Sequence, residues 1–327
     1  MILKFKTTTK IRLDSFLRLE LPKKFPDKIL SNSKIRRLII SQGVSVNNVK
    51  ILRPAFVLLK GSVVEVDFQS EKFFFEKTPD DIKFDLTLEN VLFEDDYFII
   101  VNKPAFFPTE ETIVGSEKRD SLHNSVIRYL WNKNPSLKNP PYAGIMHRLD
   151  RETSGIILFT KKREVNKAVS QMFLNHDFLK VYTSLSTYDE KLNHLKNVNS
   201  DSKNFSLELT MNRISSKSQR GKWGFVPQEK GGLYSKTEFT VKNEFLIGQK
   251  KVYQIESKLF TGRTHQIRFH LSYSGFPILG DELYGGIKDS RIMLHSSLFE
   301  FIHPVTKEKI HIESKPDFLN QKCNFLS

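Results

Sequence analysis

The 327-residue sequence contains a single cysteine, Cys323, which excludes an intrachain disulfide and any cysteine-rich zinc or iron–sulfur site. Its longest apolar runs, such as 98–101, are far too short to span a bilayer, and charged residues interrupt the N-terminus before a signal segment can form. We therefore expect a cytoplasmic protein that does not associate with membranes.

Several common nucleotide and hydrolase motifs are also missing. The sequence contains no G-x-G-x-x-G, G-x-x-x-x-G-K-[ST], H-E-x-x-H or G-x-S-x-G, so dinucleotide, triphosphate, zincin and hydrolase-elbow chemistry have no support. His265 and His270 are five positions apart, off the i, i+4 face of a helix, and no carboxylate or cysteine joins them. We expect no metal and no nucleotide or other cofactor, and these histidines are interpreted as structural or RNA-contacting.

Positive charge, in contrast, is in excess and unevenly distributed. The net charge is +14 and the pI about 9.6, typical of proteins that meet polyanions, although a merely solvated surface gives the same value. Residues 1–68 hold 14 basic and 5 acidic side chains, residues 69–120 hold 6 and 13, and residues 121–327 hold 31 and 19. These changes of sign predict a basic domain over 1–68, a linker over 69–85 and a larger domain over 86–327.

The basic domain contains a predicted amphipathic helix. Its apolar residues recur at i, i+3 and i+4, and its basic residues fall largely on the other side: Ile35, Leu38 and Ile39 against Lys34, Arg36 and Arg37. Gly43 is expected to end the helix. Residues 44–48 predict a strand and a turn, and residues 55–59 with 62–68 predict a hairpin. A basic helix alone is more often a solvated face than a nucleic-acid contact.

The order of residues in 11–17, 31–39 and 43–47 resembles the RNA-binding module shared by a small-subunit ribosomal protein and several RNA-modifying enzymes. Asn32 stands where that family often has an arginine, and residues 22–30 look like an insertion. The resemblance implies a small α/β domain in which Lys34, Arg36 and Arg37 bind RNA.

The larger domain alternates short strands with few helices. Apolar patterns predict strands over 97–101, 156–159, 181–186, 236–241 and 252–260, and helices over 122–131 and 165–173. Strands outnumber helices without regular alternation, which favours an α+β fold with a mixed, largely antiparallel sheet over a doubly wound fold. Residues 189–235 lack hydrophobic order and carry Lys217, Arg220, Lys222 and Trp223, as expected of either an RNA-facing loop or an ordinary exposed one.

Two polar segments carry the candidate chemistry. In residues 144–155, Asp150 either organises a turn or acts as a catalytic carboxylate, which needs a nearby cation. Residues 262–270 could supply that cation, because a guanidinium at Arg268 can grip a carboxylate in a fixed geometry. Thr264 is predicted to cap a helix whose apolar face includes Ile267 and Leu271.

Together these segments resemble the successive motifs of RluA-type pseudouridine synthases. The resemblance rests on His147 to Asp150 with 153–155, on 180–182, and on 262–268, with further similarity at 94–105, 277–281 and 283–286. It covers about residues 88–300. Residues 106–111, which include Glu110 and Glu111, depart from the pattern usual in the family.

The resemblance implies a role for each matching residue. Asp150 corresponds to the catalytic aspartate, Tyr182 to the tyrosine beneath the target base, and Arg268 to the arginine that pairs with the aspartate. The expected substrate-binding residues are His147, Arg148, Arg263 and Ile267, where Arg148 fills the gap left by the flipped uridine and Ile267 lines the uracil pocket. In the family these residues lie in a central cleft of a mixed β-sheet.

The implied function is RNA pseudouridine synthase, an isomerase that extrudes a uridine and needs no cofactor. Whether the aspartate attacks the sugar or generates a glycal intermediate is left open. Large-subunit ribosomal RNA is the expected substrate, with transfer RNA as the alternative. The rival interpretation is a non-catalytic RNA-binding or ribosome-assembly protein that keeps the fold. We expect RNA as the partner and a monomeric chain.

Overall fold

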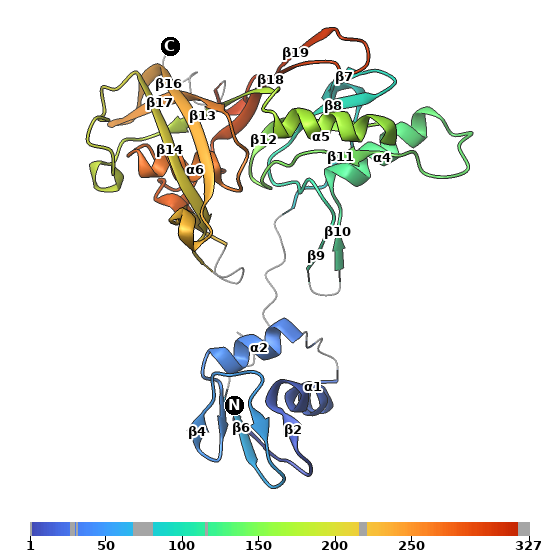
Figure 1. Cartoon of the computed structure of the whole chain (residues 1–327), viewed down its shortest axis with the longest axis vertical. Helices are drawn as coiled ribbons and strands as arrows, with labels where there is room; N and C mark the ends of the chain where they lie inside the picture. Colours follow the sequence, from blue (N-terminus) through green and yellow to red (C-terminus); the bar gives the residue numbers. More distant parts are fainter. Residues whose placement is uncertain are drawn as a thin grey trace. The chain divides into compact units, whose positions relative to one another are not determined.

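The structure is a computed structural model that describes residues 2–26, 30, 32–67, 81–114, 117–215 and 221–319. The chain divides into two compact units, residues 1–80 with 113–119 and residues 81–112 with 120–327 (Figure 1). Most of the predicted linker, residues 69–80, lies outside the described residues, as do Lys217, Arg220 and Cys323. No helix of the described ranges is long and apolar enough to cross a membrane.

The first unit packs two helices with small sheets. Helix α1 (Leu13–Lys24) contacts α2 (Asn32–Ile40), and a four-stranded sheet has the order β1 (Ile2–Lys6), β6 (Val63–Asp67), β3 (Val44–Val46), β4 (Val49–Lys50). A second pair joins β2 (Ile11–Arg12) to β5 (Val57–Leu58). The predicted helix is confirmed, because Ile35, Leu38 and Ile39 are buried against α1 and the sheet.

The predicted strand and turn over 44–48 are confirmed, since Asn47 and Asn48 adopt positive φ between β3 and β4. The predicted hairpin over 55–68 is wrong. Strand β6 pairs with β1 over five residues and with β3 over three, whereas β5 pairs with β2. Because β1 and β3 cover both edges of β6, no edge is left for β5, and a pairing with partners this distant in sequence cannot be read from local turn residues.

The second unit is built on one large sheet. Among the described residues it has eleven strands, nine of them in the order β15 (Trp223–Phe225), β14 (Asn204–Arg213), β16 (Leu233–Ile247), β17 (Lys250–Leu259), β13 (Leu179–Ser186), β18 (Leu294–Ile302), β12 (Ser154–Thr160), β8 (Phe98–Lys103), β7 (Val91–Glu94). Strand β11 (Gly144–Ile145) pairs with β12, and β19 (Lys309–Glu313) with β18. All pairs are antiparallel except β12 with β18.

The sheet is accompanied by the helices α4 (Leu122–Lys133), α5 (Asn166–Leu174) and α6 (Gln266–Tyr273). Figure 1 shows α6 beside β13, β16 and β17, and α4 and α5 beside β8, β11 and β12. Short 3-10 turns occur at Leu88–Asn90, Arg163–Val165, Glu190–Leu192, Gln228–Lys230 and Glu282–Tyr284. Strands β9 (Thr112–Val114) and β10 (Glu117–Arg119) form a separate two-stranded sheet, whose residues 113–119 are grouped with the first unit. This is the α+β fold with a mixed, mostly antiparallel sheet that the sequence predicts.

The local predictions for this unit are largely confirmed, with one correction. Each predicted strand and helix is present, and the apolar face of α4 is buried. The interpretation of 189–235 as a loop is wrong, because this segment contains β14, β15 and the start of β16. Strand β14 alternates half-buried or buried apolar residues with more polar ones, as expected beside an edge of a sheet: Phe205, Leu207, Leu209 and Met211.

The two halves of the sheet meet where β12 pairs with β18, through Ser154 with His295 and Gly155 with Ser296, a contact that we call the β12–β18 seam. Gly155 has φ +109°, and a Cβ atom there would lie 2.6 Å from the backbone nitrogen of Ser296 and closer still to its carbonyl oxygen. Ser296 also pairs with Tyr182 on β13, beside a register shift between Val181 and Tyr182. The seam therefore brings the end of the Asp150 loop into one row with Tyr182.

We predict that Gly155→Ala destabilises the protein by about 2 to 6 kcal/mol, the combined cost of strain at an unfavourable φ and of overpacking against a strand backbone. The matched control is Gly248→Ala, because Gly248 also has positive φ but has no atom within 4 Å of its Cβ position. That control should cost only about 1 to 2 kcal/mol, the cost of a non-glycine residue in the left-handed region. Chemical denaturation measures both, and equal losses would contradict the steric role of Gly155.

Candidate active site

Asp150 lies in the turn between β11 and β12, where its carbonyl accepts a hydrogen bond from Thr153 N at 3.1 Å. Lys103, which is fully buried at the end of β8, contacts the backbone of this turn. Its Nζ donates to the carbonyls of Pro104 (2.9 Å), Phe107 (2.7 Å) and Arg151 (3.1 Å). Burial lowers the pKa of Lys103 to about 7, while the charge of Asp150 opposes that shift. The lysine thus ties the Asp150 turn to the adjacent strand.

The segment that departs from the family pattern also holds the Asp150 turn. The Thr109 hydroxyl donates to the carbonyl of Leu149 at 3.0 Å, and Glu110 Oε2 accepts from Arg148 Nη1 at 2.8 Å. The ion pair is exposed, so it contributes about 0 to 1 kcal/mol at most. Residues 106–111 are therefore in contact with the loop that carries the predicted site.

The predicted pairing of Arg268 with Asp150 is present, and a second carboxylate joins it. Arg268 Nη1 lies 3.2 Å from Asp150 Oδ2, while Nε and Nη2 donate to the two oxygens of Asp281 at 2.6 and 2.8 Å. The side chains of Arg268 and Asp281 are 6% and 1% exposed, against 26% for Asp150. Burial lowers the pKa of Arg268, but the bonds and charges of the two aspartates outweigh it and raise the pKa.

Helix α6 carries Arg268, and its first turn differs from the prediction. His265, not Thr264, is the N-cap residue; its φ is +57° and its side chain makes no capping bond. The Gln266 side chain instead organises the preceding loop, accepting from Thr261 Oγ1 (2.8 Å) and Arg263 N (2.9 Å). Ile267 and Leu271 face inward as predicted.

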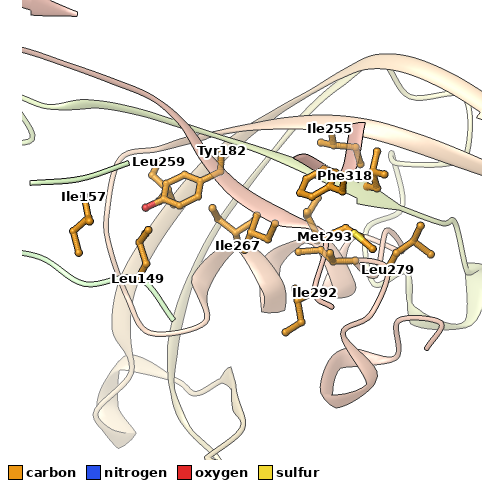
Figure 2. Packing of buried hydrophobic residues seen from close by; sticks show 14 of the residues in the cluster. Leu149, Ile157, Tyr182, Ile255, Leu259, Ile267, Leu279, Ile292, Met293 and Phe318 are labelled. Carbon is orange, nitrogen blue, oxygen red and sulfur yellow. The ribbon is translucent and has the colours of Figure 1, made fainter. Parts of the chain in front are cut away.

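Tyr182 is buried next to this cluster. Figure 2 shows its ring among apolar side chains of the main core, which include Leu149, Leu259 and Ile267. Burial raises the pKa of the Tyr182 phenol to about 12, and the negative charge of Asp150 adds to the shift. Tyr182 is therefore neutral near pH 7.

The remaining predicted substrate-binding residues occupy different surroundings. His147 Nε2 accepts from Leu158 N at 3.0 Å, and its ring stacks on Phe299. Burial lowers the pKa of His147 to about 3, which keeps the ring neutral. Arg263 is exposed and donates to the carbonyl of Tyr234 at 3.0 Å. These contacts add no support to substrate binding by His147, and for both residues that role stays a prediction.

Asp281, His265 and Tyr284 lie at the site but are not among its predicted residues; the sequence predicts only a structural or RNA-contacting role for His265. His265 Nε2 lies 3.7 Å from Asp150 Oδ2, and its Nδ1 lies 3.1 Å from the Tyr284 hydroxyl. Segments 277–281 and 283–286, which were noted for their similarity to the family, contain the other two residues. Within the described ranges no group of three histidine, cysteine or acidic residues could hold a metal ion.

Comparison with known sequences identifies the class of protein. Residues 97–273 match the family described as RNA pseudouridylate synthase. An uncharacterized RNA pseudouridine synthase of Helicobacter pylori is 31% identical over 311 residues, covering 92% of this chain and 85% of that protein. The ribosomal large subunit pseudouridine synthase C of Escherichia coli is 28% identical over 325 residues, covering 95% and 91%.

Solved structures share the fold. Human RNA pseudouridylate synthase domain containing 1 aligns with a TM-score of 0.54 and 20% identity over 71% of this chain and 85% of that chain. Human RNA pseudouridylate synthase domain containing 4 aligns with a TM-score of 0.55 and 17% identity over 73% and 93%. The chain belongs to the RNA pseudouridylate synthase family. It is an RNA pseudouridine synthase, an isomerase, as the sequence motifs predict.

We predict that Asp281→Asn destabilises the protein by about 3 to 5 kcal/mol, because it removes one partner of a buried charge pair. Asp317→Asn is the matched control, since Asp317 also pairs with an arginine, Arg291, but its side chain is 59% exposed. The control should cost less than about 1 kcal/mol. Urea denaturation at pH 7 measures the free energy of unfolding of both variants. Similar losses would contradict a special contribution of the buried Arg268–Asp281 pair to stability.

Proposed function

We propose that this enzyme converts uridine to pseudouridine in large-subunit ribosomal RNA and that Asp150 is its catalytic residue. The observation that carries the proposal is the cluster around Asp150. The buried guanidinium of Arg268 contacts one oxygen of the Asp150 carboxylate, and the charge of this carboxylate helps to raise the pKa of the neutral Tyr182. Arg268 lies on α6 and Tyr182 on β13, so both are held by the fold. A flipped uridine can reach Asp150, whose side chain is 26% exposed.

The reaction breaks the bond between the sugar C1′ and N1 of uracil and forms a bond between C1′ and C5. Uridine and pseudouridine are isomers, so the proton lost from C5 is balanced by a proton gained at N1, and no electrons are exchanged. Asp150 acts as an anion in either route, as nucleophile at C1′ or as base towards the sugar. Arg268 supplies a permanent positive charge 3.2 Å from Asp150 Oδ2 throughout.

Tyr182 and Ile267 are proposed to line the place of the uracil ring. Stacking on an aromatic ring offsets part of the cost of extruding a base, which is a few kcal/mol. Because the pKa of Tyr182 is raised to about 12, its phenol takes up a proton from C5 only if it hands its own proton on. Arg148, which is 62% exposed, is proposed to fill the gap in the RNA stack after it leaves Glu110.

Ribosomal RNA is favoured over transfer RNA by the extent of the similarity. The Escherichia coli relative, named for the ribosomal large subunit, matches 95% of this chain, which includes most of the N-terminal unit. Transfer RNA remains the alternative substrate, and mapping of modified sites separates the two.

We predict that Asp150→Asn lowers the rate of pseudouridine formation by at least about 100-fold, the loss expected when a positioned carboxylate is removed from a reaction of this type. A strain lacking the gene is complemented with the wild type, with Asp150→Asn, or with the exposed control Asp177→Asn. Carbodiimide mapping of total RNA should then detect pseudouridine at the large-subunit sites only in strains that carry the wild type or the control. Restoration by Asp150→Asn would refute the assigned role, and restored sites confined to transfer RNA would refute the substrate.

The N-terminal unit is proposed to contribute RNA affinity. Its helices form a cavity of about 320 Å³ whose lining is mainly polar and basic: Arg12, Asp14, Ser15, Arg18, Asn32, Ile35 and Arg36. Arg18 and Arg36 are exposed there, which suits contact with backbone phosphates. Of the predicted RNA-binding residues, Arg36 lines this cavity, Lys34 does not, and the side chain of Arg37 lies outside the part of the chain that is described.

We predict that the double substitution Arg18→Gln with Arg36→Gln reduces the slope of log K against log salt for RNA binding by about 1.4, since each phosphate contact on single strands contributes about 0.7. The control, Lys23→Gln with Lys50→Gln, removes the same charge from exposed positions of the same unit outside the cavity. It should change the slope by less than half as much. Filter binding across a salt series tests this, and equal changes would contradict a defined RNA site.

A further inference from the structure

His265 is a neighbour of the Asp150 carboxylate. Its Nε2 lies 3.7 Å from Asp150 Oδ2, the oxygen that also contacts Arg268 Nη1. Among the described residues no protein donor is found for the other oxygen, Oδ1. Among those residues the hydrogen bond and the ion-pair contact to this carboxylate therefore both go to Oδ2, which leaves Oδ1 available to a substrate.

A hydrogen-bond chain determines which nitrogen of His265 carries the proton. The backbone N–H of Trp223 donates to the Tyr284 hydroxyl at 2.9 Å. Among the described residues His265 Nδ1, 3.1 Å away, is the acceptor that remains for the proton of this hydroxyl, and we assign the proton of Tyr284 to that contact. Burial lowers the pKa of His265, although the charge of Asp150 opposes the shift, and the ring is neutral. The remaining proton then sits on Nε2 and faces Asp150.

The backbone of His265 indicates that this placement is enforced. His265 has φ +57°, in the left-handed region that non-glycine residues rarely occupy, and such strained conformations persist only where the surrounding structure holds them. Its carbonyl accepts from Phe269 N at 2.9 Å, and its ring meets Tyr284 edge to face. This left-handed residue stands directly before α6, one helical turn from Arg268.

Two cations also lie near the ring of Tyr284. The guanidinium carbon of Arg268 lies 5.3 Å from the centre of its ring, and Lys222 Nζ lies 5.4 Å from it. Trp223 begins β15 and Lys222 directly precedes it, in the basic and aromatic segment 189–235. The position of Tyr284 thus depends on β15 as well as on the active site.

We propose that His265 is a positioning residue for pseudouridine formation: its Nε2–H, oriented by Tyr284, holds Oδ2 of Asp150 so that Oδ1 faces the target nucleotide. This inference rests on the proposed role of Asp150. The 3.7 Å separation shortens to a hydrogen bond when the nucleotide enters, as such contacts commonly do between free and occupied sites. His265 acts through Asp150 and does not contact the reacting atoms.

The test compares two substitutions of similar length. His265→Gln keeps an N–H donor near the position of Nε2, whereas His265→Met removes it. Single-turnover pseudouridine formation is measured on total RNA from the deletion strain, together with RNA affinity. We expect His265→Met to slow the reaction about 10- to 100-fold with unchanged affinity, as for other small misplacements of a catalytic group, and His265→Gln to stay within about fivefold of the wild type.

A double-mutant cycle tests the link to Tyr284 independently, should His265→Met not fold. Tyr284→Phe should slow the wild type about tenfold but the His265→Gln variant less than twofold, because the glutamine amide has no tautomer to select. Tyr273→Phe is the control, since no described residue hydrogen-bonds the Tyr273 hydroxyl; it should leave the rate unchanged.

The outcomes separate this inference from the proposed function. Equal rates for His265→Met and His265→Gln, or an equal cost of Tyr284→Phe in both backgrounds, would overturn the positioning role while the proposed function stands. A wild type that forms no pseudouridine, or an Asp150→Asn variant with full activity, would overturn the proposed function and this inference with it.

Discussion

The site depends on one buried cation shared by two carboxylates. Arg268 can be buried because Asp281 satisfies two of its nitrogens in a fork geometry, and the third nitrogen is then directed at Asp150. Those three residues come from α6, the loop after it and the turn before β12. Breaking the pair with Asp281 would leave a charge stranded in the core, so the stability of this half of the sheet and the orientation of Asp150 are maintained by the same group.

Around that cation, contacts of different kinds restrict the Asp150 turn from several directions. Lys103 donates to the carbonyl of Arg151, and Thr109 donates to the carbonyl of Leu149. His265 lies near the carboxylate of Asp150 itself. The segment that departs from the family pattern takes part through Thr109 and Glu110. Residues 106–111 therefore contact the Asp150 turn directly and help to hold it in place.

Much of this could be predicted from the sequence, because the chemistry resides in contiguous motifs. Arg268 and Asp150 were paired on the basis of their motifs, and helical periods located α2 and α4. Asp281 was not assigned because its partnership with Arg268 depends on how the chain returns after α6. The hairpin over 55–68 failed because β6 pairs with β1 and β3, and Thr264 does not cap because His265 adopts a left-handed backbone. β14 was missed although its alternation at Phe205, Leu207, Leu209 and Met211 was visible in the sequence.

The β12–β18 seam gives Gly155 a meaning apart from chemistry. The residue closes the motif that begins at His147, yet it offers no functional group to the reaction; it leaves room for the backbone of Ser296. A sequence signature of this kind therefore joins two sorts of information, the groups that react and the clearance that lets two strands pair. A chain that had lost its activity but kept the fold would still need the glycine, so its presence reports architecture, and only the polar residues before it report an enzyme.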